Sequence, residues 1–363
     1  MIKRKILLFI VLCTLMNGSI MAQTQEEPKG KLSGTLFGSY FYNVERDTGI
    51  NSLKNVAYFG ERNVNGMTLQ RALINYDYKW NNNFSSRIAL ESDEKNFTAS
   101  SDSKSNRFSM YLKDGWVQWR FHSNHALIVG LQATPPFEMM EGVWGNRFLE
   151  KTIIDLRGIL ATRDLGVGLK GQFDSTGIVK YHLLIGNNSA SKPENDKYKR
   201  FYGQVIFAPL SGLSLLIYAD YQMQASVRDT FIRQMVSGDI LTNAFSVGYK
   251  KKDKLSAGID YYIRNAKNGY NTGSALDNQT GMGFSAYGTY LFSPKVAAVL
   301  RYDYFEPNSK KSGDTRQLFI VACNLKPVEK FTISPNIVVE SYEKTTRTIT
   351  ESVTARISFN WTF

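Results

Sequence analysis

The C-terminal segment of the chain alternates strictly between apolar and polar side chains. From Val353 to Phe363 every odd position is apolar and every even position is polar. Successive side chains of a β-strand point to opposite faces, so this segment predicts a strand with one apolar and one polar face. Its last apolar residues are Phe359, Trp361 and Phe363, large rings that suit a boundary between hydrocarbon and water. We therefore expect a strand with lipid on one side and water on the other.

The same alternation of apolar and polar residues repeats in segments along the whole chain. Short polar turns alternate with long polar loops, which gives an even number of strands, as a closed membrane barrel requires. The expected fold is all-β: a transmembrane antiparallel β-barrel of about 16 strands, with short periplasmic turns and long extracellular loops. The expected strands are residues 31–44, 67–80, 84–93, 108–122, 126–134, 163–173, 178–187, 198–208, 213–222, 242–250, 255–264, 280–292, 296–306, 316–325, 330–340 and 353–363.

Aromatic residues collect at one end of these strands. The strands that run into short turns or into the C-terminus end, on their apolar face, in an aromatic ring at Trp80, Phe121, Phe173, Phe207, Tyr249, Phe292 and Phe363. The strand ending at Leu325 is the exception. A ring at each strand end predicts an aromatic girdle at one membrane interface. Pro335 interrupts an expected strand, and because proline lacks the N–H that a ladder needs, we expect a bulge there.

The third long loop, residues 135–162, is too apolar to lie in solvent. It contains Phe137, Trp144, Phe148 and a cluster of leucine and isoleucine residues. An apolar segment of this size is buried against something, and a barrel of sixteen strands has a lumen wide enough to receive it. We expect this loop to fold into the lumen and narrow it. The alternative is that it packs at a subunit interface on the rim without constricting the bore.

The N-terminus has the pattern of a secretory signal peptide. Basic residues from Lys3 to Lys5 precede an apolar run from Ile6 to Met16, and Ala22 offers a cleavage point. We expect residues 1–22 to be the signal peptide and residues 23–363 to be the barrel domain. After residue 22 no apolar run is long enough for a membrane-spanning helix. Export together with a barrel predicts the outer membrane of a Gram-negative bacterium.

The chain is basic, with a net charge of +12, and loss of the signal peptide lowers this to +9. In an exported chain without a block of basic residues, this excess of positive charge favours anionic solutes or lipopolysaccharide, and not nucleic acid, as binding partners. The positions expected to line the pore and attract anions are Arg71, Arg87, Arg120, Arg147, Lys151, Arg157, Lys170, Lys180 and Arg301. The polar faces of the strands also carry Asp77, Glu91, Asp114, Asp220, Asp260, Asp303 and Glu340. The alternative is that these charges pair across strands and only solvate the wall.

Catalytic, metal and cofactor sites are not expected. The chain has three histidines: His122 and His125 fall at a short turn, and His182 faces the lumen. A hydrolase needs a nucleophile, a base and an orienting group gathered where substrate can reach them. No Cys/His cluster has the spacing of a metal site. We therefore expect a protein that is not an enzyme and holds no cofactor.

The segment from Asp114 to Gly171 resembles the phosphate-selective porin O and P family. The resemblance is carried by Asp114-Gly-Trp-Val-Gln-Trp119, Gly130, Pro135, Phe148-Leu-Glu150 and Arg163-Asp-Leu-Gly-Val-Gly-Leu-Lys-Gly171, and Arg301-Tyr-Asp-Tyr-Phe305 fits the same family. It implies a trimeric, sixteen-stranded outer-membrane channel whose third loop folds into the pore. The sequence departs from the family pattern Gly-Gln-x-Lys-x-Pro, because Leu131 and Ala133 stand at the Gln and Lys places. The C-terminal Phe363 also resembles the signal by which outer-membrane barrels are recognised for insertion.

These observations predict a porin for passive diffusion of small hydrophilic solutes, with a preference for anions such as phosphate. Its expected partners are outer-membrane lipid, lipopolysaccharide, the solutes themselves and two further copies in a homotrimer. The alternative is an outer-membrane receptor or adhesion barrel with a blocked lumen and partner-binding loops.

Overall fold

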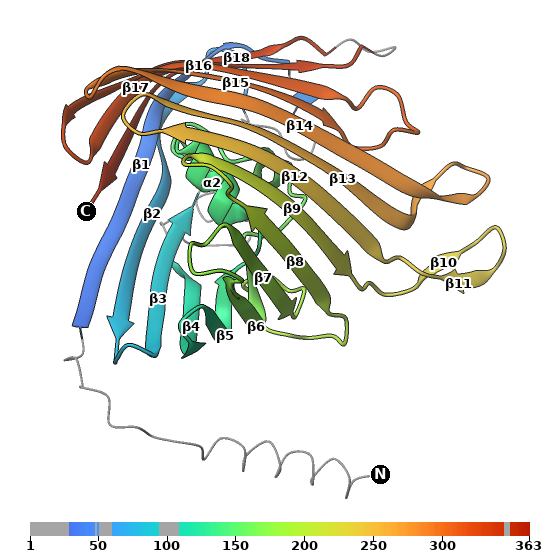
Figure 1. Cartoon of the computed structure of the whole chain (residues 1–363). Helices are drawn as coiled ribbons and strands as arrows, with labels where there is room; N and C mark the ends of the chain where they lie inside the picture. Colours follow the sequence, from blue (N-terminus) through green and yellow to red (C-terminus); the bar gives the residue numbers. More distant parts are fainter. Residues whose placement is uncertain (1–28, 48, 51–59, 94–108, 345–348) are drawn as a thin grey trace, which may run out of the picture.

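Sixteen antiparallel strands form a closed barrel in the computed structural model of the chain (Figure 1). The structure describes residues 29–47, 49–50, 60–93, 109–344 and 349–363, so the expected signal peptide lies outside the described residues. The wall consists of β1 (Lys29–Glu45), β2 (Asn65–Lys79), β3 (Phe84–Asp93), β4 (Tyr111–His122), β5 (His125–Ala133), β6 (Arg163–Gln172), β7 (Val179–Gly186), β8 (Arg200–Phe207), β9 (Leu213–Gln222), β12 (Ile240–Lys251), β13 (Leu255–Asn271), β14 (Leu276–Ser293), β15 (Val296–Glu306), β16 (Arg316–Val328), β17 (Phe331–Tyr342) and β18 (Ser352–Thr362).

The first and last strands close the barrel. β1 pairs with β2 along one edge and with β18 along the other, with Gly38 opposite Phe359 and Thr35 opposite Thr362. In hydrocarbon no water is present to satisfy a free strand edge, so a sheet that crosses a membrane must close on itself. The alternating C-terminal segment is thus the strand that completes the wall, and the predicted fold class is confirmed.

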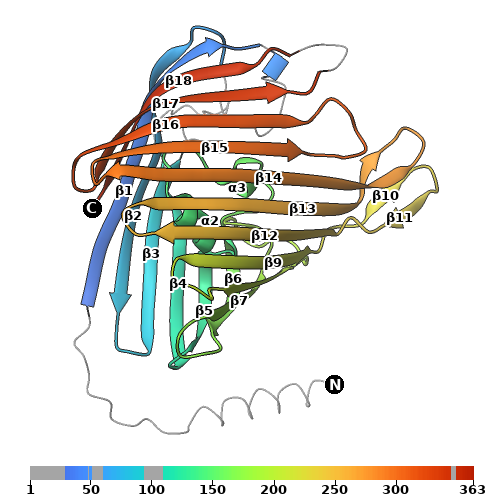
Figure 2. The same cartoon turned by 45° about the horizontal axis from the view of Figure 1, so that its top comes forward.

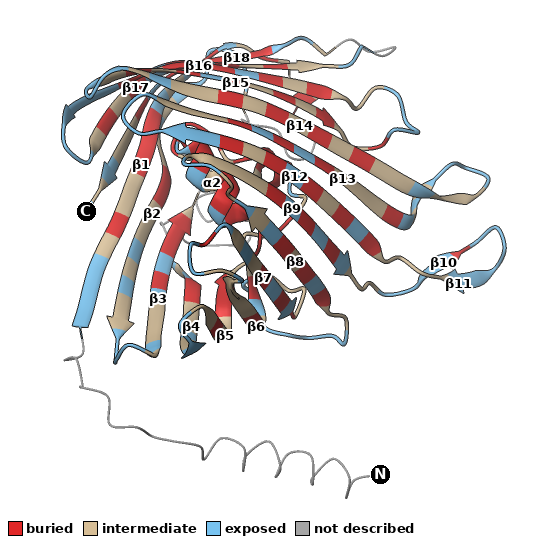
Figure 3. Ribbon diagram, in the orientation of Figure 1, coloured by how far each residue is buried: buried red, intermediate tan, exposed pale blue. Residues whose placement is uncertain are grey.

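The burial pattern along the strands is the reverse of that in a soluble protein. Asp260, Asp303 and Ser246 are at most 1% exposed, whereas Ile217 is 66% and Leu300 59% exposed. Figure 3 shows this alternation of buried and exposed positions along the strands. Large apolar side chains on the outside and charged ones on the inside are stable only when lipid surrounds the barrel.

The predicted aromatic girdle has the geometry of an interface belt. Its seven rings lie at the short-turn end of the wall and are all exposed on the outer surface, between 40% and 68%. Neighbouring rings also contact one another, for example Trp361 and Phe363 with centroids 5.0 Å apart. Amphipathic rings at this level fix the depth at which the barrel sits in the bilayer.

Three details differ from the sequence-based expectation. β13 and β14 extend well beyond the expected strand ends, to Asn271 and from Leu276, and project past the rim at the long-loop end (Figure 2). A separate hairpin, β10 (Val227–Asp229) and β11 (Gln234–Val236), forms within the expected loop 223–241. The expected bulge at Pro335 is wrong: Pro335 stays in register opposite Ile357, and the irregularity lies between Leu325 and Val328. Pro335 is tolerated because the pairing with β16 lapses locally beside it.

The third loop carries two short helices, α2 (Phe137–Trp144) and α3 (Ile153–Leu156), which lie inside the ring of strands (Figure 2). This confirms the prediction that the loop folds into the lumen. Within the described ranges, no helix is long and apolar enough to cross a membrane.

Candidate functional site: the barrel lumen

The third loop is held against one wall of the lumen by apolar contacts. Phe137, Met140, Trp144, Leu149 and Ile153 are each at most 2% exposed and belong to the main buried cluster of the molecule. On the wall side the cluster includes these inward-facing residues of β7 to β16: Leu184, Tyr202, Leu216, Tyr218, Ala244, Tyr262, Tyr287, Val299, Phe305 and Ala322. The barrel core is therefore formed between the loop and one side of the wall.

Polar contacts fix the position of the same loop. Arg301 on β15 donates from Nη1 to the carbonyl of Lys151 at 2.6 Å and lies 4.9 Å from the ring centroid of Trp144. Ser256 donates to the carbonyl of Val143 at 2.6 Å, and Asn146 donates to Thr289 at 2.8 Å. A Cβ added at Gly248 would lie only 2.4 Å from a methyl group of Val143, so α2 approaches β12 where only glycine fits. The loop is thus a fixed part of the lumen wall.

Five of the nine predicted pore-lining residues form ion pairs. Arg71 pairs with Glu91 at 3.2 Å, and Arg87 pairs with Asp77 through two bonds of 2.7 and 3.0 Å. On the third loop Arg147 pairs with Asp155 at 3.2 Å. Arg157 pairs with Glu340 at 2.6 Å, and Arg301 pairs with Asp303 through two bonds of 2.8 and 2.6 Å. Arg71 and Arg87 thus pair across strands, as in the alternative interpretation, whereas Arg147 pairs within the loop, Arg157 with the wall and Arg301 within its own strand.

One charged network was not predicted. Lys113 and Arg163 join Glu91 and Asp114 on the wall formed by β3 to β6. Lys113 and Asp114 are both buried, at 4% and 2% exposed, although strict alternation places neighbouring residues on opposite faces. The register shifts between Ala89 and Leu90 of β3, so β4 has an extra residue at this point and Lys113 turns inward. A bulge of this kind cannot be recognised from the alternation of apolar and polar residues in the sequence.

The remaining predicted residues lie apart from these pairs. Arg120, Lys170 and Lys180 gather around one cavity of about 550 Å³ near the short-turn end, which also contains His182. Glu138 of α2 is the single acidic residue that lines it. In the part of the chain that the structure describes, the three basic side chains form no ion pair. Lys151 also forms none there, and it lies on the third loop, where its carbonyl accepts from Arg301.

Two further cavities border the third loop and are lined by basic residues without any acidic one. A cavity of about 220 Å³ toward the short turns contains Lys250, Lys295 and Lys326. A cavity of about 250 Å³ toward the long loops contains Arg157, Arg264 and Arg316. Of these six residues, the sequence pointed to Arg157 as a site residue. The lysines were missed because they lie in or beside the short turns, where a basic residue is ordinary.

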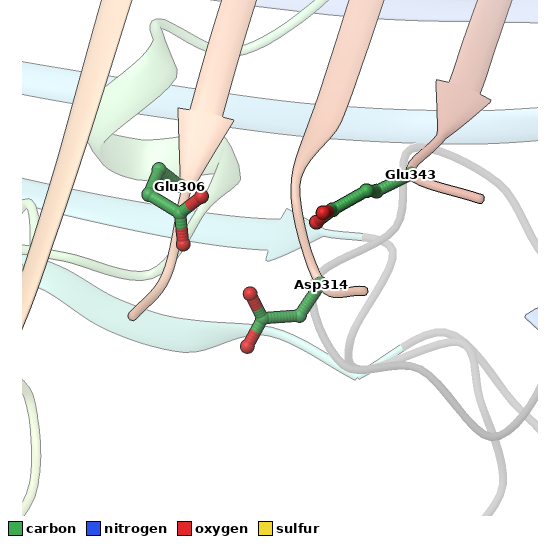
Figure 4. Close-up of side chains that lie close together, drawn as sticks. All are labelled: Glu306, Asp314 and Glu343. Carbon is green, nitrogen blue, oxygen red and sulfur yellow. The ribbon is translucent and has the colours of Figure 1, made fainter. Parts of the chain in front are cut away.

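An acidic group lies at the rim of the long-loop end. Figure 4 shows Glu306, Asp314 and Glu343 with their carboxylates turned toward one another. One oxygen of each lies within 4.8 Å of the others, so among the described residues they are a group with the geometry to hold a cation. Glu343 accepts hydrogen bonds from the Thr315 hydroxyl and from the backbone N–H groups of Gly313 and Thr315, which lowers its pKa. Burial and the neighbouring Glu306 raise the pKa of Asp314 to about 6.

Replacing Asp314 by asparagine is expected to change the pH dependence of this rim. The folded pKa of about 6 exceeds the value of about 3.9 for a free aspartate. The protonated form therefore favours the folded rim at low pH, and this stability is lost as pH rises through about 6. Amide hydrogen exchange at Gly313 and Thr315 measures it: protection in the wild type is expected to fall between about pH 4 and pH 6, relative to the Asn variant. Identical profiles for both proteins would contradict this prediction.

The histidines do not assemble a hydrolytic site in the described structure. His122 and His125 lie together at the β4–β5 turn, with ring centroids 5.3 Å apart, and Tyr181 bonds to His125 at 2.9 Å. His182 is buried on β7, and its Nε2 has no hydrogen-bond partner among the described residues. A catalytic base needs an adjacent nucleophile and an orienting group, and the described contacts of His182 supply neither.

Comparison with known proteins supports the fold. No protein-family model matches the sequence, and no curated protein matches it. The outer-membrane channel DcaP of Acinetobacter baumannii superposes with a TM-score of 0.67 at 11% identity, over 94% of this chain and 100% of that chain. An anion-selective porin from Comamonas acidovorans gives a TM-score of 0.62 at 9% identity, over 93% and 100% of the two chains. OmpT of Vibrio cholerae in its trimer form gives 0.57 at 13% identity, over 93% and 100%. The chain therefore has the porin fold, with sixteen strands and an inward-folded third loop.

Proposed function

We propose that this protein is a passive diffusion channel of a Gram-negative outer membrane that favours small anions, with phosphate among them. The support is the charge on the cavities that border the third loop. Basic side chains line all three, and Glu138 is the one acidic residue on their surfaces. Positive charge along a confined aqueous path raises the local concentration of anions and lowers their barrier to passage.

The ion pairs on the wall set a limit to this preference. Arg71, Arg87 and Arg301 are compensated by neighbouring carboxylates, so they add little net field in the lumen. Anion preference in this proposal depends mainly on Arg120, Lys170 and Lys180, with Lys151 on the loop, and on Arg264 and the cavity lysines Lys250, Lys295 and Lys326. A weak to moderate preference follows, since only part of the basic lining is uncompensated.

The structural neighbours are consistent with this proposal. One is described as an anion-selective porin and another as an outer-membrane channel. OmpT of Vibrio cholerae is described in a trimer form, which supports a homotrimer here. The proposal includes export through the signal peptide 1–22, contact with outer-membrane lipid and lipopolysaccharide, and no enzymatic activity. The alternative of a receptor barrel with a blocked lumen is not favoured by the fold.

The reversal potential in a salt gradient tests the proposal directly. Folded protein in a planar bilayer with unequal KCl on the two sides is expected to give a potential of the sign set by chloride. A potential of the opposite sign would contradict the anion preference. Absence of any conductance from folded protein, together with no solute uptake in a liposome-swelling assay, would contradict the channel and favour the receptor alternative.

A further inference from the structure

The cavity on the long-loop side of the third loop has the features of a binding site as well as of a pore wall. It is enclosed by the loop segment Arg157–Ile159 and by residues of β13 to β16. Three guanidinium groups line it, from Arg157, Arg264 and Arg316, and no carboxylate does. Among the three cavities that border the third loop, it is the one whose basic residues are all arginines, the side chain with the planar fork that matches an oxyanion.

The three arginines are in different electrostatic situations. Arg157 is paired with Glu340, and its guanidinium lies 5.1 Å from the ring centroid of Phe305. Arg316 is 6% exposed and lies 5.6 Å from the centroid of the same ring. Phe305 thus positions two guanidinium groups at one edge of the cavity. The aromatic contact orients them without neutralising their charge.

Arg264 has no carboxylate of its own. Within the described ranges it forms no ion pair, and its Nε has no hydrogen-bond partner. The charged side chains that act on it are first Arg200 and then Asp220. That carboxylate already accepts from Arg200 at 2.8 Å and from Tyr218 at 2.7 Å. Arg264 is half-buried, and an anion bound in the cavity would give its guanidinium an acceptor.

A second polar group in the same cavity also lacks a partner. Tyr262 is 0% exposed, and its hydroxyl forms no hydrogen bond to any described residue. A fully buried hydroxyl is ordinarily satisfied by protein or water. Tyr262 and Arg264 are separated by two positions on β13, so both side chains face the lumen. Each of them thus carries one donor without a partner, on the same side of the strand.

The other walls of the cavity are apolar. Ile159, Ala266, Phe305 and Pro307 line it, and the amide of Gln279 is already used by the carbonyl of Pro307 at 2.9 Å. Strongly hydrated inorganic anions gain little from such walls, whereas an apolar body is stabilised by leaving water. A cavity of about 150 Å³ holds a benzene ring, so one of about 250 Å³ has room for a ring together with a carboxylate.

We infer that this cavity is a saturable binding site for a small organic carboxylate, whose charged group contacts Arg264 and whose apolar body lies against Ile159, Ala266 and Phe305. The inference rests on the proposed channel function, because the anion reaches the cavity through the lumen. It goes beyond that function because general diffusion requires no such site. Occupancy would retain organic anions on the long-loop side of the constriction before they cross it.

Isothermal titration calorimetry on the folded barrel in detergent micelles tests the inference without requiring conduction. Three probes are compared. Benzoate has a charge and an apolar body, inorganic phosphate has a charge without an apolar body, and benzyl alcohol has an apolar body without a charge. We expect saturable binding of benzoate and at least tenfold weaker binding of the other two. Arg264→Gln is expected to weaken benzoate binding about tenfold or more, because it removes one charge-assisted hydrogen bond.

Two variants complete the experiment. Ala266→Leu fills the cavity but keeps every arginine, and we expect it to weaken benzoate binding even if Arg264→Gln does not fold. Lys252→Gln changes a basic residue in the turn between β12 and β13 and is expected to leave benzoate binding unchanged. Equal binding of phosphate and benzoate would overturn the organic class of ligand, and wild-type affinity in both cavity variants would overturn the site. If benzoate binds as expected but the barrel gives no conductance, the channel function fails and this site stands.

Discussion

Replacing Arg301 by alanine is expected to release the third loop from the wall and to raise the single-channel conductance. Arg301 joins the loop to β15 through the Lys151 carbonyl and through the ring of Trp144. It also holds Asp303, a carboxylate that is 0% exposed. Breaking a buried ion pair by removing one partner costs about 3–5 kcal/mol. We therefore expect both a wider, noisier channel in planar-bilayer recordings and a lower midpoint of chemical unfolding.

The double variant Arg301→Ala with Asp303→Ala separates these two effects. It removes the unpaired buried carboxylate, so most of the lost stability is expected to return. The loop remains untethered, so the conductance is expected to stay raised. Arg87→Ala is the matched control, because its pair with Asp77 is about a third exposed and no hydrogen bond or ion pair joins Arg87 to the loop among the described residues. Equal conductance in the wild type and both Arg301 variants would show that apolar packing alone holds the loop in place.

Replacing Arg120, Lys170 and Lys180 together by glutamine is expected to shift the reversal potential toward cation preference. These side chains line one cavity whose single acidic residue is Glu138, so their loss changes its formal lining charge from positive to negative. Salt screens charges over about 10 Å at 0.1 M and about 3 Å at 1 M. The shift is therefore expected to be large in dilute salt and small in concentrated salt.

The control for this experiment is the double variant Arg87→Gln with Asp77→Asn. It removes a compensated pair and leaves the net charge of the lumen unchanged, so its reversal potential is expected to match that of the wild type. A triple variant that keeps the wild-type potential in dilute salt would contradict the role of these three residues. In that case the cavity lysines near the third loop, Lys250, Lys295 and Lys326, would be the next residues to neutralise.

The strand framework was predictable because its cause is local. Each strand has lipid on one face and the lumen on the other, so every second side chain is apolar whatever the rest of the chain does. This is why the sequence places Asp260, Asp303 and Arg301 on the inner face and Trp361 and Phe363 on the outer face, as the structure does. The position of the third loop was predictable for a similar reason. Its residues are too apolar to lie in water, and the lumen is the space available to bury them.

The charge partners were not predictable, because they depend on the register between strands. Arg87 meets Asp77 because β2 and β3 pair in that register, and Arg157 meets Glu340 across 183 residues of sequence. One bulge in β4 brings Lys113 to the lumen, against the alternation around it. A shift of two residues in any ladder keeps every side chain on its own face but changes its partners, and nothing in a single strand selects between such registers.

The sequence by itself thus determined a closed sheet with a lipid-facing surface, a charged lumen and an apolar loop that enters it. Only the tertiary structure decided which charges are compensated and which remain to act on a solute. The guanidinium of Arg301 is hydrogen-bonded to Asp303 and to the third loop, whereas Nε of Arg264 has no partner among the described residues. The physical reason is that the two effects depend on different distances along the chain. Lipid or water on each face acts on every residue separately, whereas an ion pair forms only when two residues far apart in the sequence lie within about 4 Å of each other.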